Sequence, residues 1–361
     1  MKTFIPQELP LKEIKWEENI DLIIKANTSL ARYDELLKTL QNPTLFLTPL
    51  MKKEAVLSSR IEGTQATVED ILRHEADINS VIETEDMQEV LNYRDAMLYS
   101  TQYLKKRPVC LNLIKEIHKI LLKKVRGQNK NRGQFRQRQV WIGARGTKLE
   151  EAEFIPPAWE KINGFLSNWE KYIHYRDKDL IVQLAVIHAQ FEIIHPFLDG
   201  NGRVGRIILP LFLYQKGILS TPMFYLSEYL EKHRNSYYQN LLNISKKNDW
   251  NSWIKFFLKT VNSQAKDNIE KIYSIKALYE KTKEQLLQLR SPYSIKAIDA
   301  LFNFPFFSST RFAKFSKINN RVTAINLIKK MQSLNIIKII KKKKGSKPAI
   351  YLFPELLTLL K

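Results

Sequence analysis

The chain has 361 residues, with 58 lysines and arginines against 37 aspartates and glutamates, which gives a formal net charge of +21. Its hydrophobic fraction of 44% and charged fraction of 26% exclude wholesale disorder, and its length predicts two or three domains. The single cysteine, Cys110, excludes an intrachain disulfide framework and a zinc site built from several cysteines.

The sequence predicts neither a membrane span nor a secretion signal. Its longest uninterrupted apolar run, residues 207–214, has eight residues, whereas a membrane-spanning helix needs about 20. The first residues contain no apolar core followed by a small-residue cleavage site. We therefore expect a soluble protein of the reducing cytosol that has no membrane partner.

Helical patterns dominate the first third of the chain. Residues 1–45 form an irregular or partly helical lead-in, and residues 50–58 have helical composition. Gly63 is a natural stop for that helix. Thr67 then begins another helix, because a threonine N-cap is followed there by acids in the first turn. Helical periodicity also extends over residues 20–40, 87–104 and 111–125.

The middle of the chain has a different composition. Residues 126–138 are polar and broken by glycines. A short strand-like run follows, consisting of Gln139, Val140, Trp141, Ile142 and Gly143. With Gly146 close behind, this stretch predicts a small hairpin or flap. Apolar runs at residues 180–194, 207–214 and 250–261 predict three more helices.

The C-terminal part is a separate unit by charge and by pattern. Residues 286–361 hold 15 lysines and arginines and two acids, so they carry +13 of the net charge and the first 285 residues carry +8. A charged helical connector over residues 266–290 precedes this pattern. Three helical segments follow at residues 295–302, 308–315 and 322–334, and then two β-like runs at residues 336–340 and 349–353. Three short helices and a hairpin with a basic tip are typical of a winged helix-turn-helix.

One stretch between two apolar helices has the composition of a reactive site. It reads His195, Pro196, Phe197, Leu198, Asp199, Gly200, Asn201, Gly202, Arg203, Val204, Gly205 and Arg206. Its first two glycines flank an asparagine, so the backbone can tighten there and direct successive N–H groups inward. Such a turn at the start of a helix binds anions.

Side chains of the same stretch supply the other groups that a reaction at a phosphate needs: cationic phosphate ligands, a metal ligand and a base. Arg203 and Arg206 lie three residues apart, so a helix presents both on one face, where they can hold further phosphates. Asp199 is a lone carboxylate beside the turn, the usual protein ligand of a nucleotide-bound Mg²⁺. His195 can take a proton from an attacking hydroxyl. Together these groups predict phosphoryl or nucleotidyl transfer.

These residues match the signature HPFx[D/E]GNGRxxR, so the chain resembles the Fic (filamentation-induced-by-cAMP) family. Eight or nine fixed positions make the motif specific. The resemblance covers roughly residues 1–263. It extends to residues before the motif, at the expected flap and after the motif: His188, Phe191 and Glu192; Gln134, Phe135, Arg136, Trp141, Ile142 and Gly143; and Tyr225, Leu226 and Ser227.

The resemblance implies transfer of AMP from ATP to a Ser, Thr or Tyr hydroxyl of a target protein. His195 would be the catalytic base, Asp199 would hold Mg²⁺, and Phe197 would pack in the core and fix the loop. The phosphates would be held by N–H groups and side chains of Gly200, Asn201, Gly202, Arg203 and Arg206. The flap at residues 139–143 would bind the target's backbone by adding a strand.

A second short match resembles the family's inhibitory motif, [S/T]xxxE[G/N]. Ser58 begins it, and Glu62 and Gly63 end it, upstream of the core. Glu62 can pair bidentately with Arg206, which then cannot hold the γ-phosphate. We therefore expect a largely silent enzyme that the substitution Glu62→Gly activates.

Histidines and acids outside these motifs have structural interpretations. His118 and His174 show no spacing to a partner, and the sequence predicts no zinc site. His188 and Glu192 are expected to pack or hydrogen-bond behind the reactive loop.

The basic tail leaves two interpretations open. Winged helices often mediate protein contacts without touching DNA. Lys329 and Lys330 on the candidate recognition helix, and the lysines at 341–344 and 347 on the wing tip, lie where phosphate contacts would fall. DNA is therefore one expected partner of this unit.

The predicted fold is mainly α, with a helical Fic core, a small β-hairpin flap and a C-terminal winged helix-turn-helix. The expected domains are an N-terminal helical region at 1–110 with the inhibitory helix at about 50–63, a catalytic core at 111–263, a helical connector at 264–285, and the winged helix at 286–361. Related proteins are often dimeric, so a homodimer is a further expectation.

Two alternatives to ATP-dependent AMP transfer stay open. In the first, the same site uses another donor (UTP, GTP or a CDP-linked one) or removes AMP, with Glu62 positioning a water molecule. In the second, the protein is a DNA-binding regulator whose Fic core is a sensory module. The target protein and the donor base are not identified by the sequence.

Overall fold

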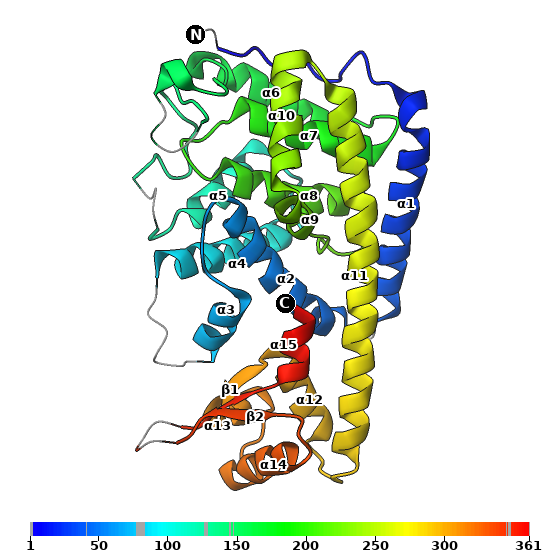
Figure 1. Ribbon diagram of the computed structural model, residues 1–361, viewed down its shortest axis with the longest axis vertical. Helices are drawn as coiled ribbons and strands as arrows, with labels where there is room; N and C mark the ends of the chain where they lie inside the picture. The colour runs from blue at the N-terminus through cyan, green and yellow to red at the C-terminus, as the bar shows by residue number, and fades with distance from the viewer. Residues whose placement is uncertain are drawn as a thin grey trace. The chain divides into compact units, whose positions relative to one another are not determined.

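The computed structural model describes residues 3–40, 42–76, 84–125, 129–143, 146, 148–343, 345 and 348–360. The chain divides into two compact units, each assembled from several stretches (Figure 1). The first unit comprises Met1–Thr39, Leu57–Thr64 and Gln88–Lys266. The second comprises Leu40–Val56, Gln65–Met87 and Asp267–Lys361.

Helices make up most of both units, which confirms the prediction of a mainly α fold. Up to the C-terminal segment they are α1 (Trp16–Thr39), α2 (Pro43–Ile61), α3 (Val68–Glu75), α4 (Glu85–Tyr103), α5 (Leu111–Leu121), α6 (Ile162–His174), α7 (Leu180–Ile194), α8 (Asn201–Gln215), α9 (Ser227–Lys232), α10 (Arg234–Lys247) and α11 (Trp250–Leu287). Two short 3₁₀ turns, η1 (Leu149–Glu151) and η2 (Trp159–Lys161), precede α6.

Helix α7 is the centre of the first unit. Its sequence is apolar on every face, and 13 of its 15 residues are buried. The Asp179 side chain caps its N-terminus by accepting hydrogen bonds from the N–H groups of Ile181 and Val182. Helices α1, α6, α8 and α10 pack against it. The residue that follows α7, His195, is therefore attached to the most completely packed element of this unit.

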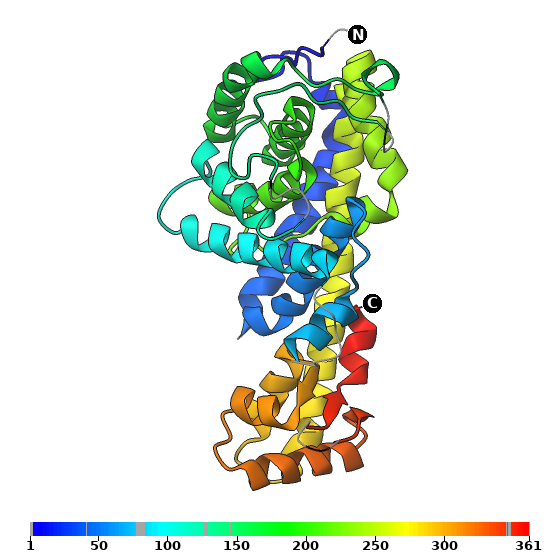
Figure 2. The same ribbon diagram turned by 90° about the vertical axis from the view of Figure 1, so that its left-hand side faces the viewer.

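Helix α11 is continuous over 38 residues. The prediction of an apolar helix at 250–261 and a separate connector after it was wrong in this respect. No glycine or proline lies between residues 250 and 287, so nothing in the sequence ends the helix. Helix α1 lies beside the first part of α11 (Figures 1 and 2), and Ser29 Oγ donates to Asn262 Oδ1 at 2.7 Å.

Helix α2 contains the predicted inhibitory segment but begins earlier than expected, at Pro43. It ends as predicted in a tight turn, where the Glu62 N–H donates to Ser59 O at 3.0 Å and the Gly63 N–H donates to Arg60 O at 2.9 Å. Gly63 has a φ of +99°, which L side chains rarely adopt. The turn fixes where Glu62 leaves the helix.

The restart at Thr67 is confirmed. Thr67 is the N-cap of α3, its side chain accepts from the Asp70 N–H, and the Asp70 side chain accepts from the Thr67 N–H. This reciprocal pair is a capping box, and it satisfies two backbone donors at the start of the helix.

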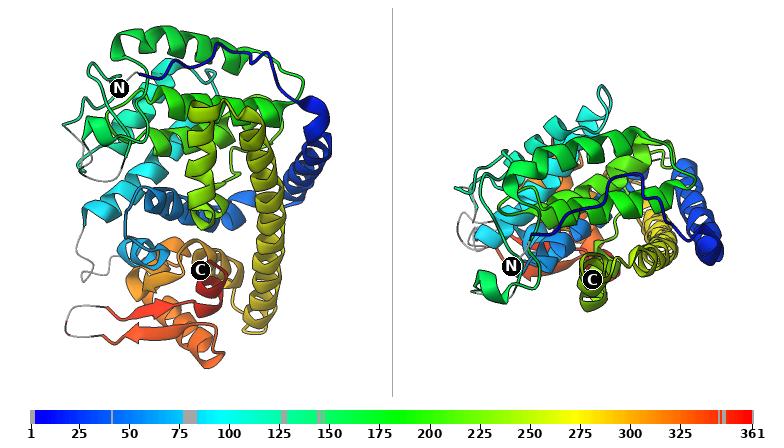
Figure 3. Two further views of the ribbon diagram at one scale, coloured as in Figure 1. Left: turned by 45° about the horizontal axis from the view of Figure 1, so that its top comes forward. Right: turned by 90° about the horizontal axis from the view of Figure 1, so that it is seen from above.

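The C-terminal segment contains α12 (Ser294–Asn303), β1 (Phe306–Ser308), α13 (Ser309–Phe315), α14 (Arg321–Ser333), β2 (Lys338–Lys341), β3 (Ile350–Leu352) and α15 (Pro354–Leu360). The strands form one antiparallel sheet in the order β1-β3-β2, with Phe306 opposite Leu352 and Lys338 also opposite Leu352. Figure 2 shows the stacked helices of this segment, and Figure 3 shows the β2–β3 hairpin.

This segment matches the predicted three helices and hairpin, with two additions. The strand β1 overlaps the start of the helix expected at 308–315, because Ser308 both ends the strand and caps α13. The last helix, α15, was not predicted. At the predicted wing tip, Lys344 and Lys347 lie outside the described residues.

The predicted flap is less regular than a hairpin. Over the described part of residues 129–161, its β pairing is a single antiparallel bridge between Ile142 and Phe154, with Ile142 N–H donating to Phe154 O at 2.8 Å. The predicted small hairpin is therefore reduced to one bridge, and the side chains of Trp141 and Ile142 are 44% and 37% exposed.

Among the described residues, no helix combines the length and the apolar character that crossing a membrane requires.

Candidate active site

The loop between α7 and α8 is a compact turn with two residues in the left-handed conformation. His195 ends α7 with a φ of 48°, and Gly200 precedes α8 with a φ of 77°. The Asn201 side chain closes the turn, because its Oδ1 accepts from the Phe197 N–H and its Nδ2 donates to Phe197 O, both at 2.9 Å. Both polar atoms of this side chain hold the loop, and its predicted contact with phosphates stays a prediction.

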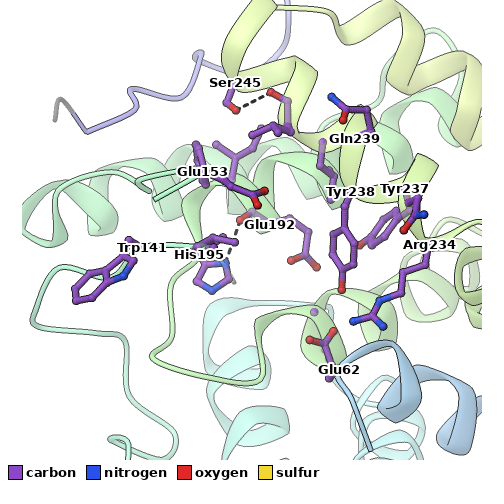
Figure 4. Close-up of a pocket in the computed structure, with 18 of the residues that line it drawn as sticks. Glu62, Trp141, Glu153, Glu192, His195, Arg234, Tyr237, Tyr238, Gln239 and Ser245 are labelled. Carbon is purple, nitrogen blue, oxygen red and sulfur yellow. Dashed lines mark hydrogen bonds between the residues drawn. The ribbon is translucent and has the colours of Figure 1, made fainter. Parts of the chain in front are cut away.

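The His195 imidazole is set up as a base. Its Nδ1 lies 3.3 Å from Glu192 O (dashed in Figure 4), and since a carbonyl only accepts, Nδ1 carries the proton in this contact. The other nitrogen, Nε2, is left as the acceptor. Burial lowers the pKa of His195 to about 4, so the ring is neutral at pH 7.

Arg136 holds the backbone of His195 from behind. This arginine is only 1% exposed, and its Nε donates to His195 O at 2.9 Å while Nη2 donates to Pro157 O at 2.6 Å. Its own N–H donates to Pro196 O at 2.8 Å. These bonds fix the left-handed geometry of His195, which carries a strain that surrounding contacts must offset.

Asp199 lies beside the turn with its side chain 32% exposed. Lys130 Nζ contacts its Oδ2 at 2.9 Å, and Arg203 Nη2 lies 3.6 Å from its Oδ1. Burial alone raises the pKa of Asp199, but the Lys130 hydrogen bond and the charge of Arg203 outweigh it and lower the pKa below its usual value. The group is therefore an ionised carboxylate at neutral pH.

The N-terminus of α8 is the predicted anion site. The first hydrogen bond of the helix runs from the Val204 N–H to Gly200 O at 3.0 Å, so the preceding N–H groups have no partner within the helix. Gly202 is in this first turn, and a Cβ built on it would lie 2.3 Å from Glu62 Oε1 and 2.9 Å from Arg206 Nη1. The carboxylate of Glu62 thus reaches the position next to the helix end where an anion is stabilised.

Arg206 is 2% exposed and is bound to both ends of the inhibitory motif. Its Nη2 donates to Glu62 Oε1 at 2.6 Å and to Ser58 O at 2.9 Å, and its Nε donates to Ser58 Oγ at 2.8 Å. The expected contact with Glu62 is confirmed, but the expected bidentate geometry was wrong, because Ser58 takes the second edge of the guanidinium. Burial alone lowers the pKa of Arg206, but Glu62, Tyr237, Tyr238 and Glu192 together outweigh burial and raise the pKa.

Arg203 is 3% exposed and makes a different set of contacts. Its Nη1 lies 3.2 Å from Glu89 Oε2, which also accepts from Thr64 Oγ1 at 2.7 Å. The Nε and Nη1 atoms of Arg203 are buried without a hydrogen bond. A buried guanidinium with unsatisfied donors is suited to a phosphate ligand.

A cavity of about 860 Å³ opens beside these groups. Its walls include the flap and one face of α10: Glu62, Trp141, Ile142, Gly143, Glu153, Phe154, Glu192, His195, Gly202, Arg206, Arg234, Asn235, Tyr238, Gln239, Leu242 and Ser245. In Figure 4 the imidazole of His195 and the carboxylate of Glu62 both face this space. Burial raises the pKa of Glu192 to about 8, so this carboxyl is mostly neutral at pH 7 and competes little with Glu62 for Arg206.

The flap supplies one side of the cavity mouth. Trp141, Ile142 and Gly143 line the cavity, and Trp141 is 44% exposed. Gln139 anchors the base of the flap, because its Nε2 donates to Val140 O and Pro156 O, both at 3.0 Å. Ile142 uses both of its backbone groups in this segment, because its N–H donates to Phe154 O at 2.8 Å and its carbonyl accepts from the Glu153 N–H at 2.9 Å.

Three residues of the site have partners that sequence reasoning missed: Arg136, His118 and Glu89. Their partners are largely backbone groups, or side chains at large sequence separation. The ring of His118 contacts residues 133 and 199, so no local spacing reveals its role. The α10 wall was also missed, because helices of that composition are common and nothing local marks it as a pocket lining. Across the described residues, no group of three or more His, Cys, Asp and Glu side chains could hold a metal ion by itself.

Two family descriptions match the chain. The Fic/DOC family N-terminal region matches residues 20–102, and the Fic/DOC family itself matches residues 108–213, which together are just over half of the chain. The second match contains the reactive loop, and the first contains the inhibitory motif.

Curated relatives carry adenylyltransferase names. "Probable protein adenylyltransferase aq_aa38" of Aquifex aeolicus is 29% identical over 48% of this chain and 51% of its own length. "Protein adenylyltransferase Fic" of Drosophila persimilis is 24% identical over 72% of this chain and 51% of its own length. The chain therefore spans about half the length of these relatives.

Two solved structures share the fold. A Fic family protein from Desulfovibrio desulfuricans superposes with a TM-score of 0.60 at 17% identity, covering 96% of this chain and 98% of that one. Fic-1 from C. elegans superposes with a TM-score of 0.54 at 19% identity, covering 72% and 74%.

The loop geometry, the fold and these matches agree, and the chain belongs to the Fic/DOC family.

Proposed function

We propose that this protein is an adenylyltransferase that transfers AMP from ATP to a Ser, Thr or Tyr hydroxyl of a target protein. The observation that carries the proposal is the neutral His195, whose Nε2 is left as an acceptor beside the N-terminus of α8 in a cavity of about 860 Å³. That cavity is of the size that cofactor-sized ligands occupy. The names of the curated relatives support the choice of AMP as the group transferred.

In the proposed reaction His195 Nε2 accepts the proton of the target hydroxyl. The hydroxyl oxygen attacks the α-phosphorus of ATP, a new P–O bond forms, the bond to the β-phosphate breaks, and pyrophosphate leaves. N–H groups at the start of α8, with Arg203 and Arg206, hold the phosphates and stabilise the charge that develops on them. Gly200, Asn201 and Gly202 contribute their backbone to this anion site.

Asp199 is the residue that would hold Mg²⁺. It is an ionised, partly exposed carboxylate next to the anion site, and a single carboxylate with phosphate oxygens is a common Mg²⁺ environment. Its present partner, Lys130, is 47% exposed and can withdraw into solvent. When bound, Mg²⁺ neutralises phosphate charge and orients the phosphates.

The face of α10 is the proposed wall of the nucleoside subsite. Tyr238, Leu242 and Ser245 line the cavity from this helix and offer one ring face, one apolar contact and one hydroxyl. On the opposite side, the flap at 139–143 is the proposed docking strand for the target's backbone, because Trp141, Ile142 and Gly143 line the cavity mouth and the segment is extended without belonging to a sheet.

Ser58 and Glu62 are the proposed inhibitory residues. Together they occupy Arg206, and the Glu62 carboxylate lies against Gly202 at the helix end where the γ-phosphate would bind. If the γ-phosphate cannot bind at this position, ATP is held with its α-phosphate displaced. A misplacement of about 1 Å can cost about 100-fold in rate. The catalytic core at 111–263 is thus controlled by the segment before it. We further propose the cytosol as its compartment.

The experiment is self-labelling and lysate labelling with the Glu62→Gly protein and each nucleoside triphosphate in turn, read by mass spectrometry. We expect addition of AMP, about 100-fold faster than in the unaltered protein. Glu13→Gly, at an exposed acid outside the site, is the matched control and should stay silent.

Other outcomes decide between the alternatives. Labelling by UTP, GTP or a CDP-linked donor would replace ATP as the substrate, and loss of AMP from a modified target would indicate the reverse reaction. No modification with any donor would contradict transferase activity altogether.

A second candidate function, DNA binding by the winged helix at 286–361, rests on the distribution of charge. Between residues 304 and 354 the sequence has 12 lysines and arginines and not one acid. Exposed members of this set lie on α14 and on β2, including Arg321, Lys329, Lys330, Lys338 and Lys341. A mobility-shift assay of the full chain on duplex DNA should show binding that weakens steeply with salt.

A further inference from the structure

His118 lies beneath the reactive loop. It is on α5, its side chain is fully buried, and its ring stacks on Phe197 with 3.8 Å between the ring centroids and 6° between the planes. The Cβ position of Gly200 is 3.7 Å from its Cδ2 atom. The ring therefore supports both the middle and the end of the turn that leads into α8.

Both ring nitrogens of His118 bind backbone groups. The Gly133 N–H donates to Nδ1 at 2.8 Å, and because an N–H only donates, Nδ1 must be the acceptor nitrogen. Nε2 then carries the proton and donates to Asp199 O at 3.1 Å. Geometry alone thus assigns one tautomer, and this tautomer ties two loops together.

The bond to Asp199 matters because of what this residue carries. Its carbonyl accepts from the buried His118, and its carboxylate contacts Lys130 and Arg203. Fixing the carbonyl orients the backbone of Asp199 and therefore the Cα–Cβ bond from which the carboxylate extends, while Lys130 and Arg203 hold the carboxylate itself. Lys130, which contacts the Asp199 carboxylate, lies in the segment 129–136. The same segment is attached to His118 through the hydrogen bond from the Gly133 N–H to Nδ1.

We propose that His118 is a positioning residue: through its Nε2–H bond to Asp199 O it aims the Asp199 carboxylate at the phosphates and the metal ion. This inference rests on the proposed function of the site. Such supporting hydrogen bonds behind a metal ligand are typically worth 10–100-fold in metal affinity or activity, as an order of magnitude.

Two substitutions separate the two nitrogens. In His118→Gln the side-chain amide reaches the Nε2 position and can still donate to Asp199 O, whereas in His118→Asn it reaches only the Nδ1 position. Both are made in the Glu62→Gly protein. His174→Gln, at an exposed histidine on α6, is the matched control.

The readout besides activity is calorimetric binding of α,β-methylene-ATP with and without Mg²⁺. We expect the tightening by Mg²⁺ to fall about tenfold in His118→Asn and to stay near the parent value in His118→Gln and in the control. The kcat for AMP transfer should likewise fall in His118→Asn and stay near the parent value in His118→Gln and in the control. If Gln and Asn behave alike while both proteins melt as the parent does, His118 only packs and the proposal is overturned.

A measurement on the unaltered chain covers the case in which the variants do not fold. ¹⁵N chemical shifts of the His118 ring should report a neutral Nε2–H tautomer, and the opposite tautomer would overturn the proposal. Failure of the proposed transferase function can be told apart from failure of this proposal. An inactive Glu62→Gly parent would contradict the transferase function, whereas the tautomer and the Mg²⁺-dependent nucleotide binding would still test the role of His118.

Discussion

The reactive loop at 195–206 and the basic segment at 304–354 both face phosphates in the functions proposed for them, but they are built in opposite ways. Asn201 and Arg206 of the loop are buried, as is Arg136 behind it, and each of the three makes several specific hydrogen bonds. In the basic segment, the lysines of α14 and β2 are exposed. The loop therefore depends on geometry and protonation, and the basic segment depends on charge density, so acid and salt should act on them differently.

The largest expected effect comes from removing the proposed catalytic base of the loop, His195. In the Glu62→Gly protein, His195→Ala removes the only group positioned in the described site to take the hydroxyl proton at Nε2, so AMP transfer should fall about 1,000-fold. Initial rates with labelled ATP measure this. His174→Ala should leave the rate unchanged, and a surviving rate in His195→Ala would mean that another group is the base.

The next effect is acid lability of the first unit. Burial lowers the pKa of His118 and His195 to about 4 and that of His188 to about 3. Unfolded histidines titrate near 6.5, so the unfolded state binds more protons below that pH. Stability is therefore complete above about pH 6.5 and is lost as the pH falls toward 4, by about 100-fold in the unfolding constant for each histidine.

Urea unfolding at pH 7 and pH 4.5 tests this loss. His188→Gln should lose less stability between the two pH values than the unaltered protein, and His174→Gln should lose the same amount. Equal losses in all three proteins would show that carboxylates, and not the buried histidines, cause the acid lability.

A smaller effect is expected at Ser58. Ser58→Ala removes the hydrogen bond from Arg206 Nε but keeps the Ser58 carbonyl and Glu62 as partners. A hydrogen bond to a charged group contributes about 1.5 kcal/mol, so we expect activation of about tenfold, less than for Glu62→Gly. Self-labelling rates of the two variants make the comparison, with Ser167→Ala, at an exposed serine on α6, as control. Equal activation by both variants would show that Ser58 and Glu62 act as one unit.

The smallest effect per residue belongs to the basic segment. Lys338→Gln and Lys341→Gln each remove one exposed charge from β2, and each should weaken DNA binding by about threefold and lower the salt slope by about 0.9. Lys25→Gln, on the exposed face of α1, is the matched control. Shift assays at several salt concentrations measure the slope, and binding that does not depend on salt would contradict a phosphate contact.

The same contrast explains what the sequence could predict. Residues 195–206 are contiguous, so their roles in a turn and helix start are local properties, and the inhibitory motif is equally compact. Arg136, His118 and Glu89 act through partners far along the chain, several of them backbone carbonyls that every residue has. No side-chain pattern marks such contacts in advance.

Two of the errors about the fold and one about the site have equally specific causes. The strand β1 has only three residues, too few for a period-2 pattern, and it shares Ser308 with the next helix cap. The flap has the composition of a strand, but it pairs through one bridge only, because composition does not determine whether a partner strand lies alongside. The bidentate Glu62–Arg206 pair failed because Ser58, four residues earlier and one helical turn away, reaches the same guanidinium.

Gly202 restricts how this protein can escape its own control by mutation. The space beside its Cα is filled by Glu62 Oε1 and Arg206 Nη1, and Gly202 also lies in the first turn of α8, the proposed phosphate site. Any side chain at 202 would expel the inhibitor and the nucleotide together. A genetic selection for constitutively active variants should therefore return changes in residues 58–63 and none at 202, so gain-of-function alleles would be confined to one short stretch upstream of the catalytic core.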